Sequence, residues 1–300
     1  MTLPPAVSHR PPQTIVLATD LSSRCDRALD RSLILARQWH ARLVALTVVE
    51  PEGTFDPLAA SALGRAGAQA RADAVRQAEQ RLRADLSMDD LPLTAKVAQG
   101  PVTEAILATC EAEAAGLIVT GIARDQVLSR IVLGSSVDVL ARRSPVPLLV
   151  VRSRARAPYD EVVVASDFSP SSRVALETAA ALFPEAGFVL FHAFSDPYPA
   201  LAGMDSAQAR SSGHQIAQGE AAAFLQSCDL PPTVRDRIRM TLAHGDAGAL
   251  LRARSRMQPA TLVVLGTQRR SGLMGLLLGS VAQRILEQTE NDVLVVPPGS

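Results

Sequence analysis

The hydrophobic pattern of this 300-residue chain alternates between two kinds of segment. Thr14–Ala18 is a short continuous apolar run, which is typical of a strand buried on both faces of a parallel sheet. Asp26–Trp39 instead places Ala28, Leu33 and Ala36 at helical spacing on one face. The alternation continues with strands expected at Leu43–Val49, Leu93–Ala98, Leu117–Thr120 and Val146–Val151 and helices at Val102–Ala115 and Ser135–Arg143. Such alternation predicts an α/β fold.

The second half of the chain repeats the first. Gly121 and Gly266 each end an apolar run, and they lie 145 residues apart. Near the start of each copy the offset is 147, where Ile15–Ser22 corresponds to Val162–Ser169. The offset of 145 also separates Gly100 from Gly245, Gly134 from Gly279, and Ser135 from Ser280. So many landmarks in one register indicate a duplicated domain.

Each copy therefore predicts a doubly wound α/β domain with a mostly parallel sheet. We expect domain 1 at residues 13–152 and domain 2 at residues 158–297. The boundary, Arg152–Pro158, is short and polar and ends in a proline. Its alternating arginines could form a phosphate-binding stripe, but its composition favours a solvated linker.

Composition and charge narrow the class of partner. Thirty basic residues balance thirty acidic ones and aromatic residues make up only 3% of the chain, so we expect no nucleic-acid partner. No segment has the roughly 20 uninterrupted apolar residues of a membrane span, so we expect no membrane partner. The three cysteines, Cys25, Cys110 and Cys228, are odd in number and far apart, which favours a reducing, cytoplasmic location.

Candidate binding residues fall where the strands are expected to end. In an open α/β sheet the ligand crevice lies outside the carboxyl ends of the strands. Asp167 follows the first strand of domain 2, Gly266 ends the fourth, and Gly279–Ser280 opens the next helix. A carboxylate there suits a ribose hydroxyl or a metal-bridged phosphate, while a helix start offers N–H groups to phosphate oxygens. The corresponding residues of domain 1 are Asp20, Gly121, Gly134 and Ser135.

An ordinary structural role is the alternative for each of these residues. Asp and Ser just after a strand commonly cap a helix, because their oxygens accept from the free N–H groups of its first turn. Asp20-Leu21-Ser22 could be no more than such a cap. The whole set is placed at the crevice in both copies, which favours a nucleotide-type site in the ancestry of the chain.

At these residues the chain resembles the universal stress protein family, as a tandem of two domains. The resemblance covers about Thr14–Val296 and rests on the aspartate after the first strand, the spacing Gly-x-x-Gly-x9-Gly-Ser/Thr, and a last strand of the type Pro-Val-x-Leu-Val-Val. It implies a Rossmann-like, five-stranded parallel sheet in each domain and a pseudo-two-fold relation between the domains. It also implies that Leu148–Val151 and Leu294–Val296 pair antiparallel within the chain.

The same resemblance implies ATP as ligand, with Mg alongside it. The positions that would contact the nucleotide are Asp167, Gly266, Gly279, Ser280 and Val281 in domain 2, and Asp20, Gly121, Gly134 and Ser135 in domain 1. Both copies depart from the family pattern at the second loop glycine, which is Arg124 in domain 1 and Arg269 in domain 2. If that position needs a positive φ, an arginine costs roughly 1 kcal/mol or more. Domain 1 also carries Asp125, which would repel a triphosphate, so domain 2 is expected to hold the better site.

Two functions stay open at this point. One is a nucleotide-responsive regulatory or sensor protein in stress adaptation, and the other is a protein-interaction module whose phosphate loops have decayed. The sequence has no G-x-x-x-x-G-K-[ST], no G-x-S-x-G and no histidines at metal-ligand spacing, which disfavours an enzyme and a metal site. An enzyme would be at most a weak ATPase that uses the same loop, with Asp167 as its one identifiable general base. An unknown protein partner and a homodimer of tandem chains are further expectations. The segments 51–67 and 195–213 are expected to be long irregular loops.

Overall fold

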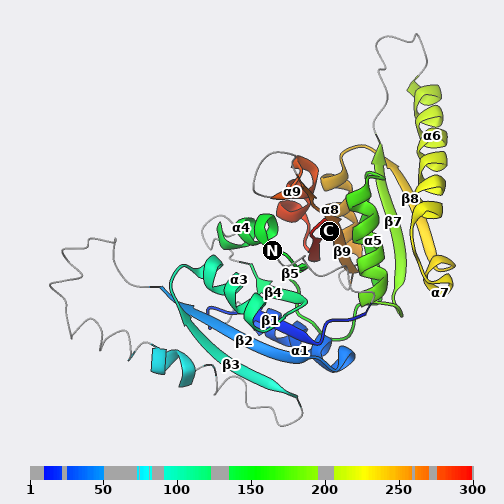
Figure 1. Cartoon of the computed structure of the whole chain (residues 1–300). Helices are drawn as coiled ribbons and strands as arrows, with labels where there is room; N and C mark the ends of the chain where they lie inside the picture. Colours follow the sequence, from blue (N-terminus) through cyan, green and yellow to red (C-terminus); the bar gives the residue numbers. More distant parts are fainter. Residues whose placement is uncertain are drawn as a thin grey trace.

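The structure places both halves of the chain on one continuous sheet (Figure 1). It is a computed structural model that describes residues 10–21, 26–50, 73, 75–80, 82, 91–122, 135–194, 206–258, 261–269 and 276–298. Domain 1 contributes β1 (Thr14–Ala18), α1 (Asp26–Trp39), β2 (Arg42–Val49), β3 (Leu93–Gln99), α3 (Val102–Ala112), β4 (Leu117–Gly121), α4 (Ser135–Arg143) and β5 (Leu148–Val151). Domain 2 contributes β6 (Glu161–Ala165), α5 (Pro170–Leu182), β7 (Gly187–Phe194), α6 (Ser206–Ser227), α7 (Pro232–Arg235), β8 (Ile238–His244), α8 (Ala247–Met257), β9 (Thr261–Gly266), β10 (Gln268–Arg269), β11 (Leu276–Leu277), α9 (Ser280–Gln288) and β12 (Asp292–Val296).

The strand order within each domain is that of a doubly wound sheet. It runs β3-β2-β1-β4-β5 in domain 1 and β12-β9-β6-β7-β8 in domain 2, with neighbours parallel throughout each domain. The first strand of each domain lies in the middle, so the chain winds outward to one side and then to the other. The predicted Rossmann-like class is therefore confirmed.

The two sheets join through the last strand of each domain. β5 and β12 pair antiparallel, with Leu148 opposite Val295, Leu149 opposite Leu294, and Val150 opposite Val293. This confirms the predicted pairing within one chain. It also merges the two expected five-stranded sheets into a single sheet of ten strands.

Helices cover both faces of the sheet and divide the core in two. One cluster joins α1, α5 and α6 through residues such as Leu35, Leu176 and Phe224. The other joins α3, α4, α8 and α9, with Ile106 and Leu251 among its members. The inner strands between them, such as β5 and β12, read as continuous apolar runs because both of their faces are buried. In the described segments, no helix is long and apolar enough to cross a bilayer.

Two expectations about connecting segments are wrong in part. Residues 206–213 were expected in an irregular loop, but they form the first turns of α6, which stands out beside β7 and β8 in Figure 1. The expected loop at 51–67 lies outside the described residues. The expected solvated linker is wrong at Arg152, which is 1% exposed, and at Ala155, which is also buried. Leu286 and Thr289, whose carbonyls accept from the Arg152 guanidinium, lie more than 130 residues away in sequence, so local polarity did not reveal the burial of this side chain.

Candidate functional site

The topology brings the candidate residues of each domain to one edge of the sheet. β9 lies between β12 and β6, and Gly266 ends β9 opposite Val296. Asp167 follows the end of β6, the neighbouring parallel strand. In domain 1, Gly121 ends β4 and Asp20 follows β1 in the same relation. In both domains the strand order therefore brings the aspartate and the glycine to the carboxyl ends of neighbouring strands, as expected.

The turn after the first strand has the same backbone form in both domains. Leu21 and Phe168 both have left-handed backbone, with φ of 57° and 62°. In domain 1 the Thr19 hydroxyl accepts from the Leu21 N–H at 3.0 Å, and in domain 2 the Ser166 hydroxyl accepts from the Phe168 N–H at 3.0 Å. Left-handed backbone is costly for residues with a side chain, so these local hydrogen bonds help to hold the turn.

The Asp167 carboxylate is part of the start of α5. Its Oδ1 accepts from the Ser169 N–H at 3.1 Å and from the Ser172 hydroxyl at 2.7 Å. Ser169 is the N-cap of α5, and its hydroxyl accepts from the Ser172 N–H. Burial alone would raise the pKa of the Asp167 carboxyl, but the hydrogen bonds from Ser169 and Ser172 outweigh it, and the pKa is lowered. The carboxylate is thus ionised at neutral pH on an exposed residue while it supports the helix start.

Gly266 has a packing reason to be glycine. A Cβ at this position would lie 2.5 Å from the Ser171 carbonyl oxygen, which is closer than real Cβ contacts. The backbone of α5 approaches β9 at this point, and only a residue without a side chain allows the approach. The sequence pattern suggested a ligand glycine, and the contact that explains it became visible only in the fold.

The connection from β9 to α9 begins and ends in an ordered arrangement. Thr267 is buried, and its N–H donates to the Val296 carbonyl at 2.9 Å. β10 and β11 then pair as a short antiparallel hairpin, with Gln268 opposite Leu277. The expected glycine-rich turn is therefore closed at its base by a hairpin, which the sequence did not predict.

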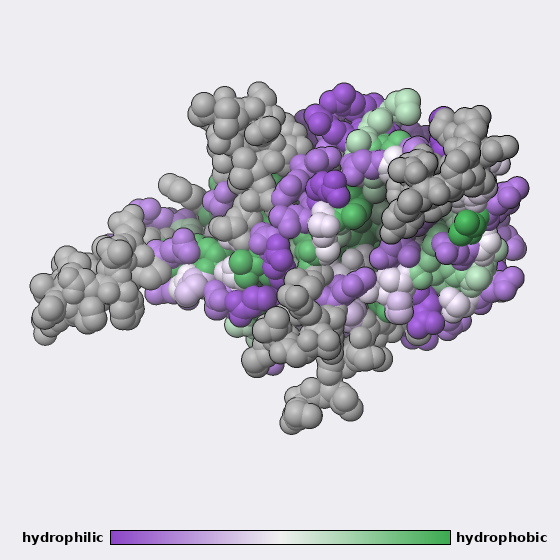
Figure 2. Space-filling view, turned by 90° about the horizontal axis from the view of Figure 1, so that it is seen from above, coloured by the Kyte–Doolittle hydropathy of each residue, from purple (hydrophilic) through white to green (hydrophobic). Residues whose placement is uncertain are grey.

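The N-terminus of α9 is open to solvent. Gly279 is its N-cap, with φ of −56° and ψ of 153°, and within the described residues no side chain caps the helix. An added Cβ on Gly279 would have nothing within 4 Å. Ser280 and Val281 are exposed, the valine at 45%. The first N–H groups of this helix are therefore available to an anion. Figure 2 shows the molecule from above, where hydrophilic and hydrophobic residues alternate in small groups over the coloured surface.

Several predicted positions remain untested. Gly134 and Arg124 lie outside the described residues. Ser135 begins α4 as expected, although its side chain is not among those described. Arg269 lies in β10, and its side chain is likewise outside the description. The contrast between the two phosphate loops thus stays a prediction.

An aromatic pair beneath the Asp167 turn was missed from sequence. The Phe168 ring stacks on the His192 ring at 4.3 Å between centroids, and it packs against Phe224 at 5.6 Å. His192 Nδ1 lies 2.8 Å from the Ser166 carbonyl oxygen. Phe168 lies in the repeated stretch Val162–Ser169, and His192 lies in β7, more than 20 residues further along the chain. Their contact joins β7 and α6 to the turn, and no local pattern signals it.

Comparisons with known proteins agree with this architecture. The sequence profile of the universal stress protein family matches residues 12–152 and again residues 158–297. A universal stress protein of Mycobacterium tuberculosis is 30% identical over 240 residues, which cover 76% of this chain and 76% of that protein. One from Mycolicibacterium smegmatis is 29% identical over 196 residues, covering 62% of this chain and 63% of its own.

Solved structures agree at the level of the fold. A protein of unknown function from Pseudomonas aeruginosa matches with a TM-score of 0.65 at 20% identity, over 96% of this chain and 93% of its own. A universal stress protein from Archaeoglobus fulgidus matches with a TM-score of 0.61 at 16% identity, over 96% of this chain and 99% of its own.

Proposed function

The chain belongs to the universal stress protein family, and on that premise we propose that it is a nucleotide-responsive regulatory protein. In this proposal domain 2 holds ATP or a related nucleotide and domain 1 has a degenerate site. The protein acts as a sensor by binding, without turnover, in the cytoplasm. The two described cysteines, Cys110 and Cys228, are buried and free, as suits a reducing compartment.

One observation carries the proposal: the open N-terminus of α9 beside the end of β9. Among the residues that the structure describes, no side chain caps this helix, and its first residues are exposed, so its N–H groups and dipole can receive phosphate oxygens. The ionised Asp167 carboxylate follows the neighbouring strand, where it suits a ribose hydroxyl or the Mg²⁺ that accompanies ATP. The residues present thus fit a magnesium nucleotide.

Thermal unfolding with and without millimolar Mg-ATP tests the proposal. We expect the ligand to raise the Tm, because a ligand that binds only the folded state stabilises it. Ser280→Pro removes one N–H donor and the hydroxyl from α9, and we expect it to weaken binding by about tenfold. Proline is compatible with the first position of a helix, and Pro170 already occupies it in α5.

Ser280→Ala is the matched variant for that experiment. It keeps the N–H and removes only the hydroxyl, so the difference between the two variants isolates the backbone donor. The unliganded Tm of each variant reports whether the fold is retained. Binding that is equally strong in wild type and Ser280→Pro would contradict the placement of phosphate on α9.

The second candidate function is a protein-interaction module with decayed nucleotide sites. It is favoured because two residues of the candidate site also have structural roles. Asp167 supports the start of α5, and Gly266 leaves room for the backbone at Ser171. Arg269→Gly separates the two functions. Nucleotide binding that arises only in this variant would support the decayed site, whereas binding in the wild type supports the sensor.

Partners beyond the nucleotide are part of the same proposal. We expect a protein partner of unknown identity and, between tandem chains, a homodimer. Native mass spectrometry of the purified protein would report the bound nucleotide and the number of chains together. A single chain free of nucleotide would count against both.

A further inference from the structure

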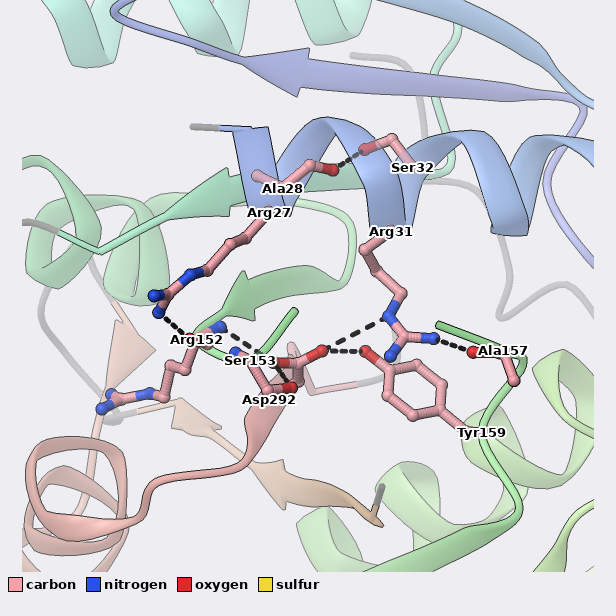
Figure 3. Close-up of polar contacts among 9 residues, drawn as sticks. All are labelled: Arg27, Ala28, Arg31, Ser32, Arg152, Ser153, Ala157, Tyr159 and Asp292. Atoms are coloured by element: carbon pink, nitrogen blue, oxygen red, sulfur yellow. Dashed lines mark hydrogen bonds and ion pairs between the residues drawn. The ribbon is translucent and has the colours of Figure 1, made fainter. Parts of the chain in front are cut away.

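A buried polar network connects the two domains at the junction of β5 and β12 (Figure 3). Its centre is Asp292, the first residue of β12, which is 0% exposed. One carboxylate oxygen accepts from the N–H groups of Arg152 and Ser153, at 2.8 and 3.0 Å, and from the Ser153 hydroxyl. The other accepts from the Tyr159 hydroxyl at 2.6 Å and lies 3.4 Å from Nε of Arg31 in α1.

Both arginines of the network are buried and held at several points. The Arg31 guanidinium lies 3.8 Å from the centre of the Tyr159 ring and donates to the Ala157 carbonyl at 2.8 Å. The Arg152 guanidinium donates to the carbonyls of Leu286 and Thr289, at the C-terminal end of α9. The network therefore involves α1 of domain 1, the linker, and both α9 and β12 of domain 2.

The pseudo-symmetric side of the junction has none of these groups. The offset of 147 relates α1 to α5, and the shared burial of Ala28 with Ala175 and of Ser32 with Ala179 supports that register. The counterparts of Arg31, Asp292, Arg152, Ser153 and Tyr159 are, in that order, Thr178, Pro147, Pro297, Pro298 and Pro12. Pro297 and Pro298 have no N–H, so they lack the two backbone donors that Asp292 uses.

We infer that this network makes the junction selective: the β5 face of domain 1 fits a domain-2 partner and rejects a second copy of domain 1. Two copies of domain 1 would bury Arg31 against Pro147, which offers no carboxylate. Two copies of domain 2 would bury Asp292 beside Thr178 and prolines, without a cation or an N–H donor. A buried charge without a partner is strongly disfavoured, whereas the mixed pair satisfies both charges.

The inference limits how two chains can associate. A homodimer of tandem chains that each keep their internal pairing has to use a different face, because each β5 and each β12 is then already matched within its own chain. Exchange of domains between chains remains compatible with the network, since it still pairs domain 1 with domain 2.

A nicked full chain tests this selectivity. A site for a specific protease is inserted between Arg154 and Ala155, beside an arginine that is 76% exposed on its side chain, and the folded chain is cleaved. Cleaved samples with and without isotope labels are mixed and analysed by native mass spectrometry. We expect the two halves to remain together and mixed-domain complexes to exceed same-domain complexes by at least about a hundredfold.

The variant Arg31→Thr/Asp292→Asn removes both charges and is expected to admit same-domain complexes in that experiment. Same-domain complexes at comparable levels in the wild type would overturn the inference. Halves that separate and do not recombine would overturn it as well, because the face would then select no partner.

The intact chain provides a second measurement. Arg31→Thr and Asp292→Asn are each expected to lower the Tm by several degrees, and the double variant by less than the sum of the two. Arg154→Thr is the matched control, since this exposed linker arginine lies 3.9 Å from Asp30, and we expect the Tm of this variant to stay within about one degree of wild type. Additive effects of the two changes would contradict a direct pairing between them.

Discussion

Domain 1 and domain 2 share their strand order and the backbone of two turns, and they differ in the buried polar groups at their junction. Both turn left-handed after the first strand, and both place a glycine with positive φ after the third strand, Gly100 at 120° and Gly245 at 128°. The polar contacts at the junction, in contrast, have no counterpart on the other side of the pseudo-axis. The comparison teaches that duplication preserved what the backbone requires and left the side-chain chemistry free to diverge.

The largest expected effect tests the close approach in domain 2. Gly266→Ala would place its Cβ 2.5 Å from the Ser171 carbonyl, so we expect a loss of about 2–3 kcal/mol in the free energy of unfolding, measured with denaturant. Gly279→Ala is the control, because an added Cβ there meets nothing within 4 Å and φ is negative. We expect it to cost less than about 1 kcal/mol. Equal losses in the two variants would mean that Gly266 does not act through Ser171.

Gly100 and Gly245, the glycines with positive φ after the third strands, provide a test of whether the two domains are equivalent there. We expect Gly100→Ala and Gly245→Ala to cost about 1–3 kcal/mol each, because their φ values belong to backbone that residues with side chains avoid. Space is not the reason, since a Cβ at Gly100 would meet nothing within 4 Å and one at Gly245 only Leu250 at 3.7 Å. Denaturation curves that differ widely between the two variants would break the equivalence of the domains.

Tyr159→Phe tests the polar side of the junction between the domains, where Asp292 lies. It removes the hydroxyl that donates to Asp292 and keeps the ring beneath Arg31, so we expect a loss of about 1–3 kcal/mol at pH 7. Burial, together with the charge of Asp292, raises the pKa of Tyr159 well above its usual value. The stability that this tyrosine contributes is therefore fully present below about pH 10, the unfolded value, and is lost as the pH rises through the folded pKa.

The difference in unfolding free energy between wild type and Tyr159→Phe, measured between about pH 8 and 11, tests this pH dependence. Wild type and Tyr159→Phe are expected to converge toward the alkaline end of that range. A constant difference across the range would indicate that the tyrosine does not titrate with folding.

The smallest expected effect concerns Asp167. Its pKa is lowered in the folded state, so its contribution is present above the unfolded value of about 3.9 and is lost as the pH falls through the folded pKa. Because the residue is exposed, we expect Asp167→Asn to change stability at pH 7 by less than about 1 kcal/mol. The variant should also flatten the acid side of the stability curve below about pH 4. A large loss at neutral pH would show that Asp167 does more than support α5.

The sequence predicted most of the fold and less of the site. Continuous apolar runs located the inner strands of both domains, because a strand buried on two faces leaves that pattern. The start of α6 was missed, since its buried residues include Gly213, Ala217 and Ala221, which do not stand out as a hydrophobic face.

The remaining errors have a common physical origin. Arg152 was assigned to solvent because its neighbours are polar, whereas its acceptors come from the end of α9. Position 266 needs a glycine because it contacts α5, a helix that begins almost 100 residues earlier in the chain. Contacts of this range follow from the strand order, which a local pattern does not encode.

The antiparallel pairing of β5 with β12 has a consequence for aggregation. A separate five-stranded domain would expose two unpaired strands, and in each domain one of them would be β5 or β12, whose residues are all buried here. Joining the domains covers these two most apolar edges with each other. The strands left at the ends of the sheet, β3 and β8, carry Lys96 and Arg239, and each of these charges is paired with a glutamate. Charged residues on an open edge discourage further strand addition, so fusion of the two domains leaves only the edges that are protected against it.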